Sequence, residues 1–354
     1  MLKILPYLKL CVEKNGSDLF FTANAPAQIK IEGELMPIGK QILTAEFIRE
    51  VAYSILTPDQ QAHLNEHWEI DLATEAGGLG RFRVNIFNQR GSLGMVLRHV
   101  RSTVPRLDDI AGLPPVLKDL IQHKRGLVLM VGATGSGKST TLAAMINHRN
   151  EISSGHILTI EDPIEFIHPN IRSIINQREV GQDTVSYERA LKSSLREAPD
   201  VILVGEVRTR ETMDACIQLA NTGHLAISTL HANNAYQALQ RIVNLYPESL
   251  RSQLYMDLSL TLRAIVSQRL VKRKDGKRCA AMEVMITTPF IQDLILNQRI
   301  DELKEAMNQS SDKGMLTFDA SLYGLYQSGA IALEEALANA DSRTNLEAKI
   351  NFGT

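Results

Sequence analysis

The sequence predicts an α/β fold in two domains: a small α+β domain over residues 1–100 and a larger domain with a parallel-sheet core over residues 116–354. Three observations support this prediction. The 354 residues are more than one compact core usually holds. Continuously apolar segments recur in the second half with helical stretches between them, which is typical of parallel strands covered on both faces. Residues 101–115 contain three prolines and one glycine, so they are expected to form an exposed linker.

The first hundred residues alternate strand and helix signals. IKIEGEL (29–35) and RFRVNIF (81–87) alternate apolar and polar residues, which predicts two half-buried strands. A helix is expected to begin after Thr44, because apolar residues recur every four positions from Phe47. Thr57, followed by proline, predicts the cap of a second helix.

The second half is predicted to form a parallel sheet with helices on both faces. Its strands are expected at residues 126–132, 156–162, 201–206 and 224–230. The first strand is expected to lead into a helix that includes residues 141–146. In the basic run VKRKDGKR (271–278), Asp275-Gly276 predicts a two-residue hairpin turn, whose lysines are solvated or, alternatively, form a docking surface. After residue 285 we expect a mostly helical extension, with a polar tail from about Asp341.

Charge, cysteine content and hydropathy argue against several classes of protein. Lys and Arg (38) nearly balance Asp and Glu (40), so no overall field would draw the chain to nucleic acid or acidic lipid. Cys11, Cys216 and Cys279 form no C-x-x-C pair, which argues against a structural zinc site and suits a reducing cytoplasm. The first residues lack the pattern of a signal peptide, and no apolar run approaches the ~20 residues that cross a bilayer. We therefore expect no direct membrane insertion, and a role at a membrane would depend on partners.

A phosphate loop is the most specific motif of the sequence. Residues 132–139 read GATGSGKS and fit G-x-x-x-x-G-K-[ST], with a predicted strand before them and a predicted helix after them. A chance match in a glycine-rich turn would lack these flanking elements. Lys138 is expected to bridge the β- and γ-phosphates of ATP, and the Ser139 hydroxyl to bind Mg²⁺. The predicted nucleotide-binding residues are Gly132, Ala133, Thr134, Gly135, Ser136, Gly137, Lys138, Ser139 and Thr140.

An acidic segment ends the next predicted strand. TIEDPIEF (159–166) brings Glu161, Asp162 and Glu165 close together in the sequence. The carboxyl end of a strand is where open α/β sheets bind ligands. The alternative is a solvated acidic turn.

A glutamate and a histidine end the two strands after that. VILVGE ends in Glu206, where NTPases with a phosphate loop usually have a metal-binding aspartate. Glu206 could polarise the attacking water, or it could form a salt bridge with Arg208 or Arg210. His231, at the end of the last predicted strand, is placed to sense the γ-phosphate. His224 begins that strand, and a structural role is about as well supported for it as a functional one.

These segments together resemble the secretion ATPase superfamily, the ring-shaped hexameric motors of type II secretion and type IV pili. The resemblance rests on the phosphate loop and on TIEDPIEF, DVILVGEVR and GHLAISTLHA, and it covers nearly the whole chain. It implies a RecA-like P-loop ATPase domain preceded by a small PAS-like α+β domain. In that family Gly-Glu ends the second acidic strand, so Glu206 is implied to be the catalytic glutamate. Glu165 is implied to act near Mg²⁺ and water, and Ser139, Glu161 and Glu165 to hold the metal through ATP and water.

Three arginines also match the superfamily. Arg83 and Arg98 match arginines that are expected to reach the nucleotide across the ring, and Arg196 matches another near it. A planar, always charged guanidinium suits phosphate oxygens that gain charge during transfer. Surface salt bridges are the alternative for each of them. Lys192 stands where relatives often carry arginine.

Within the superfamily the chain resembles the type IV pilus retraction ATPases of the PilT/PilU family. Assembly and secretion ATPases carry an additional N-terminal domain and usually a tetracysteine module, and this sequence has neither. REAPD (196–200), SLTLRAIVSQRL (259–270) and GMLTFDASLYGLYQSGAI (314–331) look like PilU. Gln292 replaces an arginine that PilT-like members carry after Thr-Pro, so the resemblance implies catalysis more directly than retraction without a partner.

The resemblance therefore implies a hexameric, ATP-hydrolysing motor that powers or assists pilus retraction and twitching motility. The implied partners are identical subunits, a PilT-like retraction ATPase and the inner-membrane pilus platform protein. The implied location is cytoplasmic, peripheral at the inner membrane. Three alternatives stay open: a pilus assembly or type II secretion ATPase, a regulatory partner that binds ATP, and a nucleic-acid motor on a RecA-like core. The near-neutral charge argues against the last of these, and nucleic acid is not an expected partner.

Overall fold

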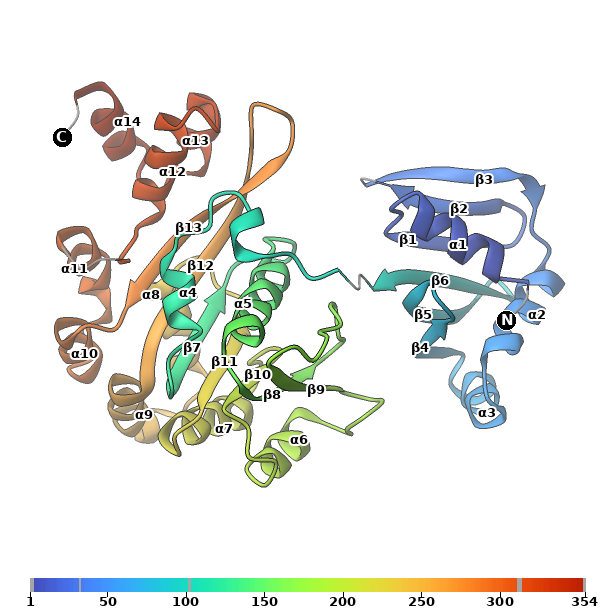
Figure 1. Ribbon diagram of the computed structural model, residues 1–354, viewed down its shortest axis with the longest axis horizontal. Coiled ribbons are helices and arrows are strands. Elements are labelled where there is room, and N and C mark those ends of the chain that lie inside the picture. Colours follow the sequence, from blue (N-terminus) through green and yellow to red (C-terminus); the bar gives the residue numbers. More distant parts are fainter. Residues whose placement is uncertain (1–2, 32, 101–102, 311–313, 353–354) are drawn as a thin grey trace. The chain divides into compact units, whose positions relative to one another are not determined.

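A computed structural model describes residues 3–31, 33–100, 103–310 and 314–352. The chain divides into two compact units (Figure 1). The first unit comprises residues 1–103 and 165–167, and the second comprises residues 104–164 and 168–354. The predicted α/β class is confirmed, with an antiparallel sheet in the first unit and a mainly parallel sheet in the second.

The first unit is built on a six-stranded antiparallel sheet with the strand order β3-β2-β1-β6-β5-β4. Its core cluster combines apolar side chains of this sheet with those of three helices. The elements are α1 (Leu5–Glu13), β1 (Asp18–Phe21), β2 (Pro26–Ile31), β3 (Glu34–Ile42), α2 (Ala45–Ile55), α3 (Pro58–His67), β4 (Glu69–Ala76), β5 (Gly80–Gln89) and β6 (Ser92–Val100).

Both helix starts predicted for the first unit are confirmed. The Thr44 side chain accepts a hydrogen bond from Phe47 N–H at the start of α2. Thr57 and Gln60 form a reciprocal capping box at the start of α3. Each side chain satisfies a backbone donor that the first helical turn leaves without a partner.

The two predicted strands of the first unit have different outcomes. Residues 81–87 lie within β5, and the inward-facing Phe82, Val84 and Ile86 are fully buried. The single strand predicted for residues 29–35 is wrong, because β2 ends at Ile31 and the antiparallel β3 begins at Glu34. Gly33 adopts a φ of 93° between them, a conformation that suits a turn rather than a continuing strand. Residue 32 lies outside the described residues.

The second unit is built on a seven-stranded sheet with the order β13-β12-β7-β11-β10-β8-β9, in which β13 pairs antiparallel and the other neighbours pair parallel. Its strands are β7 (Gly126–Val131), β8 (Gly155–Glu161), β9 (Ser173–Glu179), β10 (Val201–Val204), β11 (Leu225–Leu230), β12 (Leu262–Lys272) and β13 (Arg278–Ile286). Its helices are η1 (Leu107–Asp109), α4 (Val116–Leu120), α5 (Lys138–Ile152), α6 (Tyr187–Ser194), α7 (Arg210–Asn221), α8 (Ala235–Asn244), α9 (Glu248–Thr261), α10 (Pro289–Leu296), η2 (Ile300–Glu302), α11 (Leu303–Gln309), α12 (Phe318–Gln327), α13 (Leu333–Asn339) and α14 (Arg343–Phe352).

The parallel strands are covered on both faces, as their apolar sequences predict. All six residues of β7 are buried. Leu127, Leu129 and Val131 pack in one cluster, which includes apolar residues of α7, α8 and α9. Val128 and Met130 pack in another, which includes residues of α4 and α5. Alternate side chains of one strand thus enter two separate cores.

The second unit begins inside the segment expected to be a linker. Leu107 is buried in the core that includes α5. The Ala111 carbonyl accepts a hydrogen bond from Ala280 N–H at 2.9 Å. A Cβ on Gly112 would lie 2.0 Å from the Ala280 carbonyl oxygen, so glycine allows this close approach. Residues 104–115 therefore belong to the second unit, with Ala111 and Gly112 against β13, and residues 101–102 lie outside the described residues.

One further expectation for the C-terminal part is wrong, and one is refined. The β12–β13 turn has three residues, 274–276, rather than two, because the Arg273 N–H donates to the Lys277 carbonyl at 2.8 Å across it. The tail expected from about Asp341 forms α14, and Leu346 is buried in a cluster with residues of α12 and α13. A single apolar residue per turn is enough to dock this otherwise polar helix.

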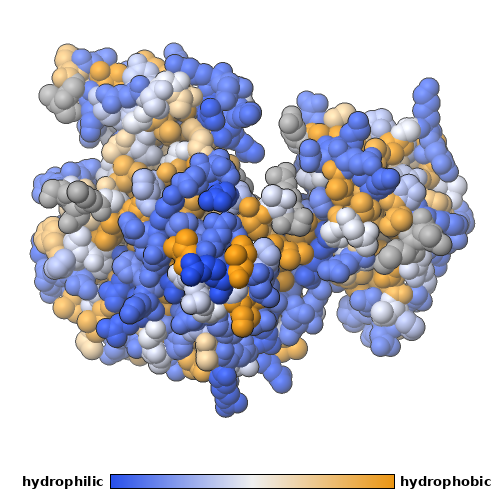
Figure 2. Space-filling view, viewed as in Figure 1, coloured by the Kyte–Doolittle hydropathy of each residue, from blue (hydrophilic) through white to orange (hydrophobic). Residues whose placement is uncertain are grey.

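No helix within the described residues is long and apolar enough to cross a membrane. Hydrophilic residues cover most of the face shown in Figure 2, with apolar residues in small groups.

Candidate functional site

The phosphate loop connects β7 to α5. Gly132 and Gly137 have φ values of 152° and 88°, which residues with a side chain rarely adopt. A Cβ at either glycine would lie within 3 Å of Gln268, of its carbonyl oxygen at Gly132 and of its side-chain nitrogen at Gly137. The loop therefore needs glycine both for its backbone conformation and for its contact with β12.

Gln268, on β12, forms hydrogen bonds with the phosphate loop and with α5. Its side chain donates to the Ser136 carbonyl at 2.9 Å and accepts from the Thr141 hydroxyl at 2.8 Å. Gln268 is only 2% exposed, so both hydrogen bonds lie away from water and fix the loop against the first turn of α5. No local motif of the sequence points to Gln268, although a polar pair, Ser267 and Gln268, interrupts an apolar strand.

Lys138 is the first residue of α5 and directly follows the glycines of the phosphate loop. Its Nζ donates to the carbonyls of Gly132 at 2.7 Å and Ala133 at 2.9 Å. Ser139 and Thr140 follow in the first helical turn and are partly exposed. The end of a helix where N–H groups lack partners, next to a lysine, is suited to a phosphate chain.

The strand order brings the other predicted residues to the same edge as the loop. β7, β11, β10 and β8 are adjacent and parallel (Figure 1), so their carboxyl ends lie side by side. The loop follows β7, His231 follows β11, Glu206 follows β10 and Glu161 ends β8. This edge is therefore the candidate site.

The Glu206 carboxylate is held by two side chains. Its Oε1 lies 3.2 Å from Nε2 of His231. Its Oε2 accepts from Nε of Arg208 at 2.8 Å and lies 2.7 Å from Nη2. The two alternatives considered for Glu206 are therefore compatible, since the carboxylate that contacts His231 also forms a salt bridge with Arg208.

A tyrosine that the sequence analysis did not single out packs beside this carboxylate. A Cβ on Gly205 would lie 2.5 Å from the Tyr187 hydroxyl and 3.3 Å from the Glu161 Cα. Burial, together with the charges of Asp162 and Glu161, raises the pKa of Tyr187, so its hydroxyl stays protonated. The glycine before Glu206 is therefore required by the close approach of α6.

The three carboxylates of TIEDPIEF do not share one environment. Oε1 of Glu161 accepts from the Thr159 hydroxyl at 2.6 Å and from Nε2 of Gln177 at 3.2 Å. Asp162 and Glu165 are exposed in the loop after β8. Glu165 belongs to the short segment that groups with the first unit.

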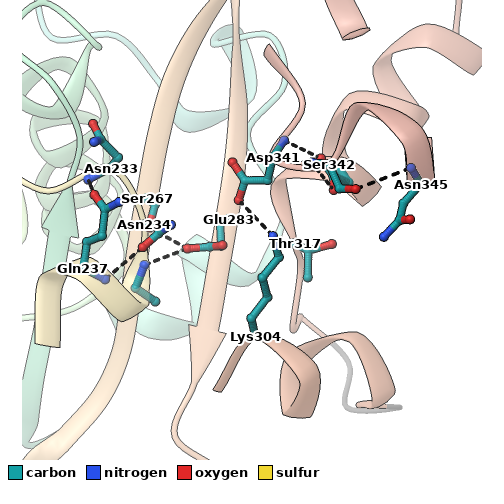
Figure 3. A network of polar contacts seen from close by, with 12 residues as sticks. Asn233, Asn234, Gln237, Ser267, Glu283, Lys304, Thr317, Asp341, Ser342 and Asn345 are labelled. Carbon is teal, nitrogen blue, oxygen red and sulfur yellow. Dashed lines mark hydrogen bonds and ion pairs between the residues drawn. The ribbon is translucent and has the colours of Figure 1, made fainter. Parts of the chain in front are cut away.

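The loop that carries His231 is anchored at the start of α8 (Figure 3). The Asn234 side chain caps the helix by accepting from Gln237 N–H at 2.9 Å. Ala235 N–H donates to Oε1 of Glu283 at 2.8 Å, and the Ser267 hydroxyl donates to the same oxygen at 3.0 Å. Burial raises the pKa of Glu283, and the two donors partly oppose this. A buried carboxyl group on β13 thus fixes the chain four residues after His231.

His224 lies at the opposite end of β11 from His231. Its Nδ1 lies 3.1 Å from both the Leu219 carbonyl and the Thr222 hydroxyl. These contacts close the turn between α7 and β11, which is the structural role considered for this residue.

Two of the three predicted arginines, Arg83 and Arg98, belong to the first unit, and Arg196 belongs to the second unit together with the phosphate loop. Arg83 and Arg98 are directly opposite each other on β5 and β6 of the first unit. Arg98 donates to Asp18 at 2.8 Å, and Arg83 lies 3.9 Å from Asp71. Arg196 is exposed in the turn after α6, at the amino end of β10, whereas Glu206 follows its carboxyl end.

The residues at the edge fit a magnesium ion only together with a nucleotide. Within the described residues no group of three or more His, Cys, Asp and Glu side chains could hold a metal ion. Mg²⁺ is commonly bound by one or two protein oxygens together with substrate phosphates. The Ser139 hydroxyl and the Glu161 carboxylate are oxygen ligands of this kind at the same edge.

Two pockets flank the phosphate loop. One, of about 380 Å³, lies between Gly132, His231 and the polar face of α8. The other, of about 270 Å³, lies between the loop and β12, where Arg269 and Arg278 contribute to its lining. Cavities thus lie on both sides of the phosphate loop.

Comparisons with known proteins agree with this arrangement. A family model described as "Type II/IV secretion system protein" matches residues 12–327. The chain is 51% identical to the type IV pilus ATPase PilU of Pseudomonas aeruginosa, over 98% of this chain and 91% of PilU. It is 40% identical to the PilT retraction ATPase of the same organism, over 94% of this chain and 96% of PilT. A crystal structure of the pilus retraction motor PilT with bound ADP matches with a TM-score of 0.91 and 38% identity, over 97% of this chain and 98% of that one. The chain therefore belongs to the type II/IV secretion system protein family, in the group that includes PilU and PilT.

Proposed function

We propose that the protein is a P-loop ATPase motor that powers or assists the retraction of type IV pili. The observation that carries this proposal is the shared edge of four parallel strands, where the phosphate loop, Glu161, Glu206 and His231 meet. The relatives named PilU and PilT are described as pilus ATPases, and the PilT structure holds ADP. ATP is accordingly the proposed ligand of the loop.

In the proposed reaction Glu206 is the general base. A water proton passes to Glu206 while the water oxygen forms a bond to the γ-phosphorus. The bond from that phosphorus to the β–γ bridging oxygen breaks, and ADP leaves with the electron pair. His231 lies 3.2 Å from the same carboxylate, so a contact between His231 and the γ-phosphate would change the surroundings of the base.

Charge on the phosphates is balanced by the loop and by residues that other subunits would contribute. Lys138 is placed to hold the β- and γ-phosphates. Ser139, Glu161 and Glu165 would hold Mg²⁺, directly or through water, and the ion would supply positive charge to the phosphates. Arg83, Arg98 and Arg196 are proposed to act from a neighbouring subunit, as the arginines that Arg83 and Arg98 match are expected to do, and Arg196 lies at the amino end of β10, opposite to Glu206. This division of the site supports a ring, and a homo-hexamer is the proposed assembly.

The proposed role is that of PilU, beside a PilT-like motor on the inner-membrane pilus platform protein. The protein would then be cytoplasmic and peripheral at the inner membrane. A strain that lacks the protein is expected to extend pili normally but to retract them with less force under load. Counting surface pili and measuring retraction force, with and without the PilT-like partner, tests this role.

Two results would contradict it. A deletion strain without surface pili would place the protein among the assembly ATPases. Full-force retraction driven by this protein in a strain without the PilT-like partner would make it a primary motor rather than an assisting one.

A further inference from the structure

Arg208 makes the closest contacts with the proposed general base. Its Nε and Nη2 lie 2.8 and 2.7 Å from the same oxygen, Oε2 of Glu206. The Glu206 side chain is 14% exposed and the Arg208 side chain 67% exposed. Two donors on one oxygen restrict the rotation of the carboxylate more than one donor does.

The backbone around this pair is fixed on both sides. Gly205 N–H donates to the Ile160 carbonyl at the end of β8, at 2.8 Å. Val207 N–H donates to the Thr229 carbonyl of β11, at 2.9 Å, and the Val207 side chain is buried. Because Glu206 lies between two anchored residues, the direction of its Cα–Cβ bond is set by the sheet, and the torsions of its side chain remain to be fixed by contacts such as those with Arg208 and His231.

The strand order gives the two carboxylate oxygens different surroundings. Oε1 contacts His231, which follows β11, and β11 lies between β10 and the strand of the phosphate loop. Oε2 contacts Arg208. The charge of Asp162, which follows β8 on the other side of β10, also acts on this guanidinium. Hydrogen bonding to Glu206 is the main cause that raises the pKa of Arg208, and Asp162 adds to it. Oε1 is therefore the oxygen on the side of the phosphate loop.

We propose that Arg208 is a positioning residue for Glu206, which holds Oε2 so that Oε1 receives the proton of the attacking water. This inference rests on the proposed function, in which Glu206 is the general base. Arg208 does not touch the reacting atoms in this scheme. The water proton moves to Oε1, the water oxygen bonds to the γ-phosphorus, and ADP leaves with the electrons of the broken bond.

The test compares Arg208→Ala with Arg210→Ala in the full-length chain. Arg210 is a matched control, because it follows Arg208 by two residues and has its own carboxylate partner, Asp214, at 3.3 Å. We expect Arg208→Ala to lower kcat ~10–100-fold. This loss does not exceed the ~10²–10⁴-fold loss that follows removal of a general base. The KM for ATP and the binding of a fluorescent ATP analogue should stay within threefold. Arg210→Ala should keep kcat within threefold.

Three further measurements separate positioning from a structural or direct role. Groups that act as a unit have non-additive effects, so Arg208→Ala should cause no further loss in a Glu206→Gln background. Added guanidinium ion at millimolar concentration should restore part of kcat in Arg208→Ala and none in Glu206→Gln. An unchanged thermal midpoint for Arg208→Ala would show that the loss does not come from unfolding.

The outcomes distinguish this inference from the proposed function. A kcat within threefold of wild type for Arg208→Ala would overturn the inference. It would also be overturned if Arg208→Ala lowered kcat by the same factor in the Glu206→Gln variant as in the wild type, because that would indicate direct contact of Arg208 with the phosphates. Glu206→Gln with wild-type activity, or a wild-type chain that does not hydrolyse ATP, would overturn the proposed function and with it the role of Arg208.

Discussion

At the scale of single residues, Gly205 sets how closely α6 approaches the end of β10. The position of its missing Cβ lies 2.5 Å from the Tyr187 hydroxyl, closer than real contacts allow. The next atoms, at 3.3 Å, belong to the backbone of Ile160 and Glu161 and cannot rotate away. The tyrosine hydroxyl is thus the first group that a larger residue would displace.

Gly205→Ala is expected to lower ATP hydrolysis about tenfold and the stability by ~1–3 kcal/mol, because overpacking shifts the end of the strand that carries Glu206. Adding Tyr187→Phe removes the nearest contact and should restore part of both. Tyr187→Phe alone is the control and should stay close to wild type. Phosphate release and thermal melts of the three variants measure these effects. A double variant no better than Gly205→Ala would show that the tyrosine is not the obstacle.

Sequence reasoning found the residues at this edge but not those that support them. Glu206 and His231 each end an apolar strand, and the carboxyl ends of parallel strands meet, so their proximity could be predicted. Gln268 bonds to Thr141 across 127 residues of sequence, and no local pattern encodes such a pair. Arg208 was visible as a salt-bridge candidate, but the choice between Arg208 and Arg210 depends on side-chain geometry.

At the scale of secondary-structure elements, β12 supports the phosphate loop. Gln268 joins this strand to the Ser136 carbonyl and to the Thr141 hydroxyl of α5. A buried group that loses its partner costs ~1–3 kcal/mol. The geometry of the loop therefore depends on a strand from the distant C-terminal part of the sequence.

Gln268→Ala is expected to weaken ATP binding at least ~10-fold and to lower the thermal midpoint, since both loop contacts are lost. Gln268→Glu keeps an acceptor for Thr141 but cannot donate to the Ser136 carbonyl, so it should also bind ATP weakly. Titration with a fluorescent ATP analogue measures the affinity. Gln253→Ala, which removes an exposed glutamine bonded to Asp257, is the matched surface control. Wild-type affinity in Gln268→Ala would contradict the bracing role.

Element boundaries were predicted well where a side chain marks them and poorly where tertiary packing decides. Thr44 and Thr57 mark the starts of α2 and α3. The start of α14 is marked by Ser342, whose side chain accepts from Asn345 N–H at 3.4 Å, and the helix packs Leu346 against neighbouring helices. The two-residue hairpin predicted at Asp275-Gly276 is wrong at a turn with tertiary contacts, because Lys274 N–H donates to the Ala330 carbonyl at 3.1 Å and Arg273 pairs with Ile331.

At the scale of the whole molecule, the chain carries a base and a phosphate loop in the second unit and a pair of opposed arginines in the first. Arg83 and Arg98 are held by Asp71 and Asp18 within their own unit. The proposed ring would bring such arginines to a neighbour's nucleotide, so hydrolysis by an isolated subunit should be slow. The catalytic assignment itself depends on one carboxylate.

The most direct test of that assignment is steady-state phosphate release by wild type and by Glu206→Gln, measured together with ATP binding. Lys138→Ala is the comparison, because it should lose tight ATP binding rather than chemistry alone. Glu206→Gln is expected to bind ATP as wild type does and to hydrolyse it ~10²–10⁴-fold more slowly, the usual cost of removing a positioned general base. Phosphate release by Glu206→Gln within tenfold of wild type would contradict the role of Glu206.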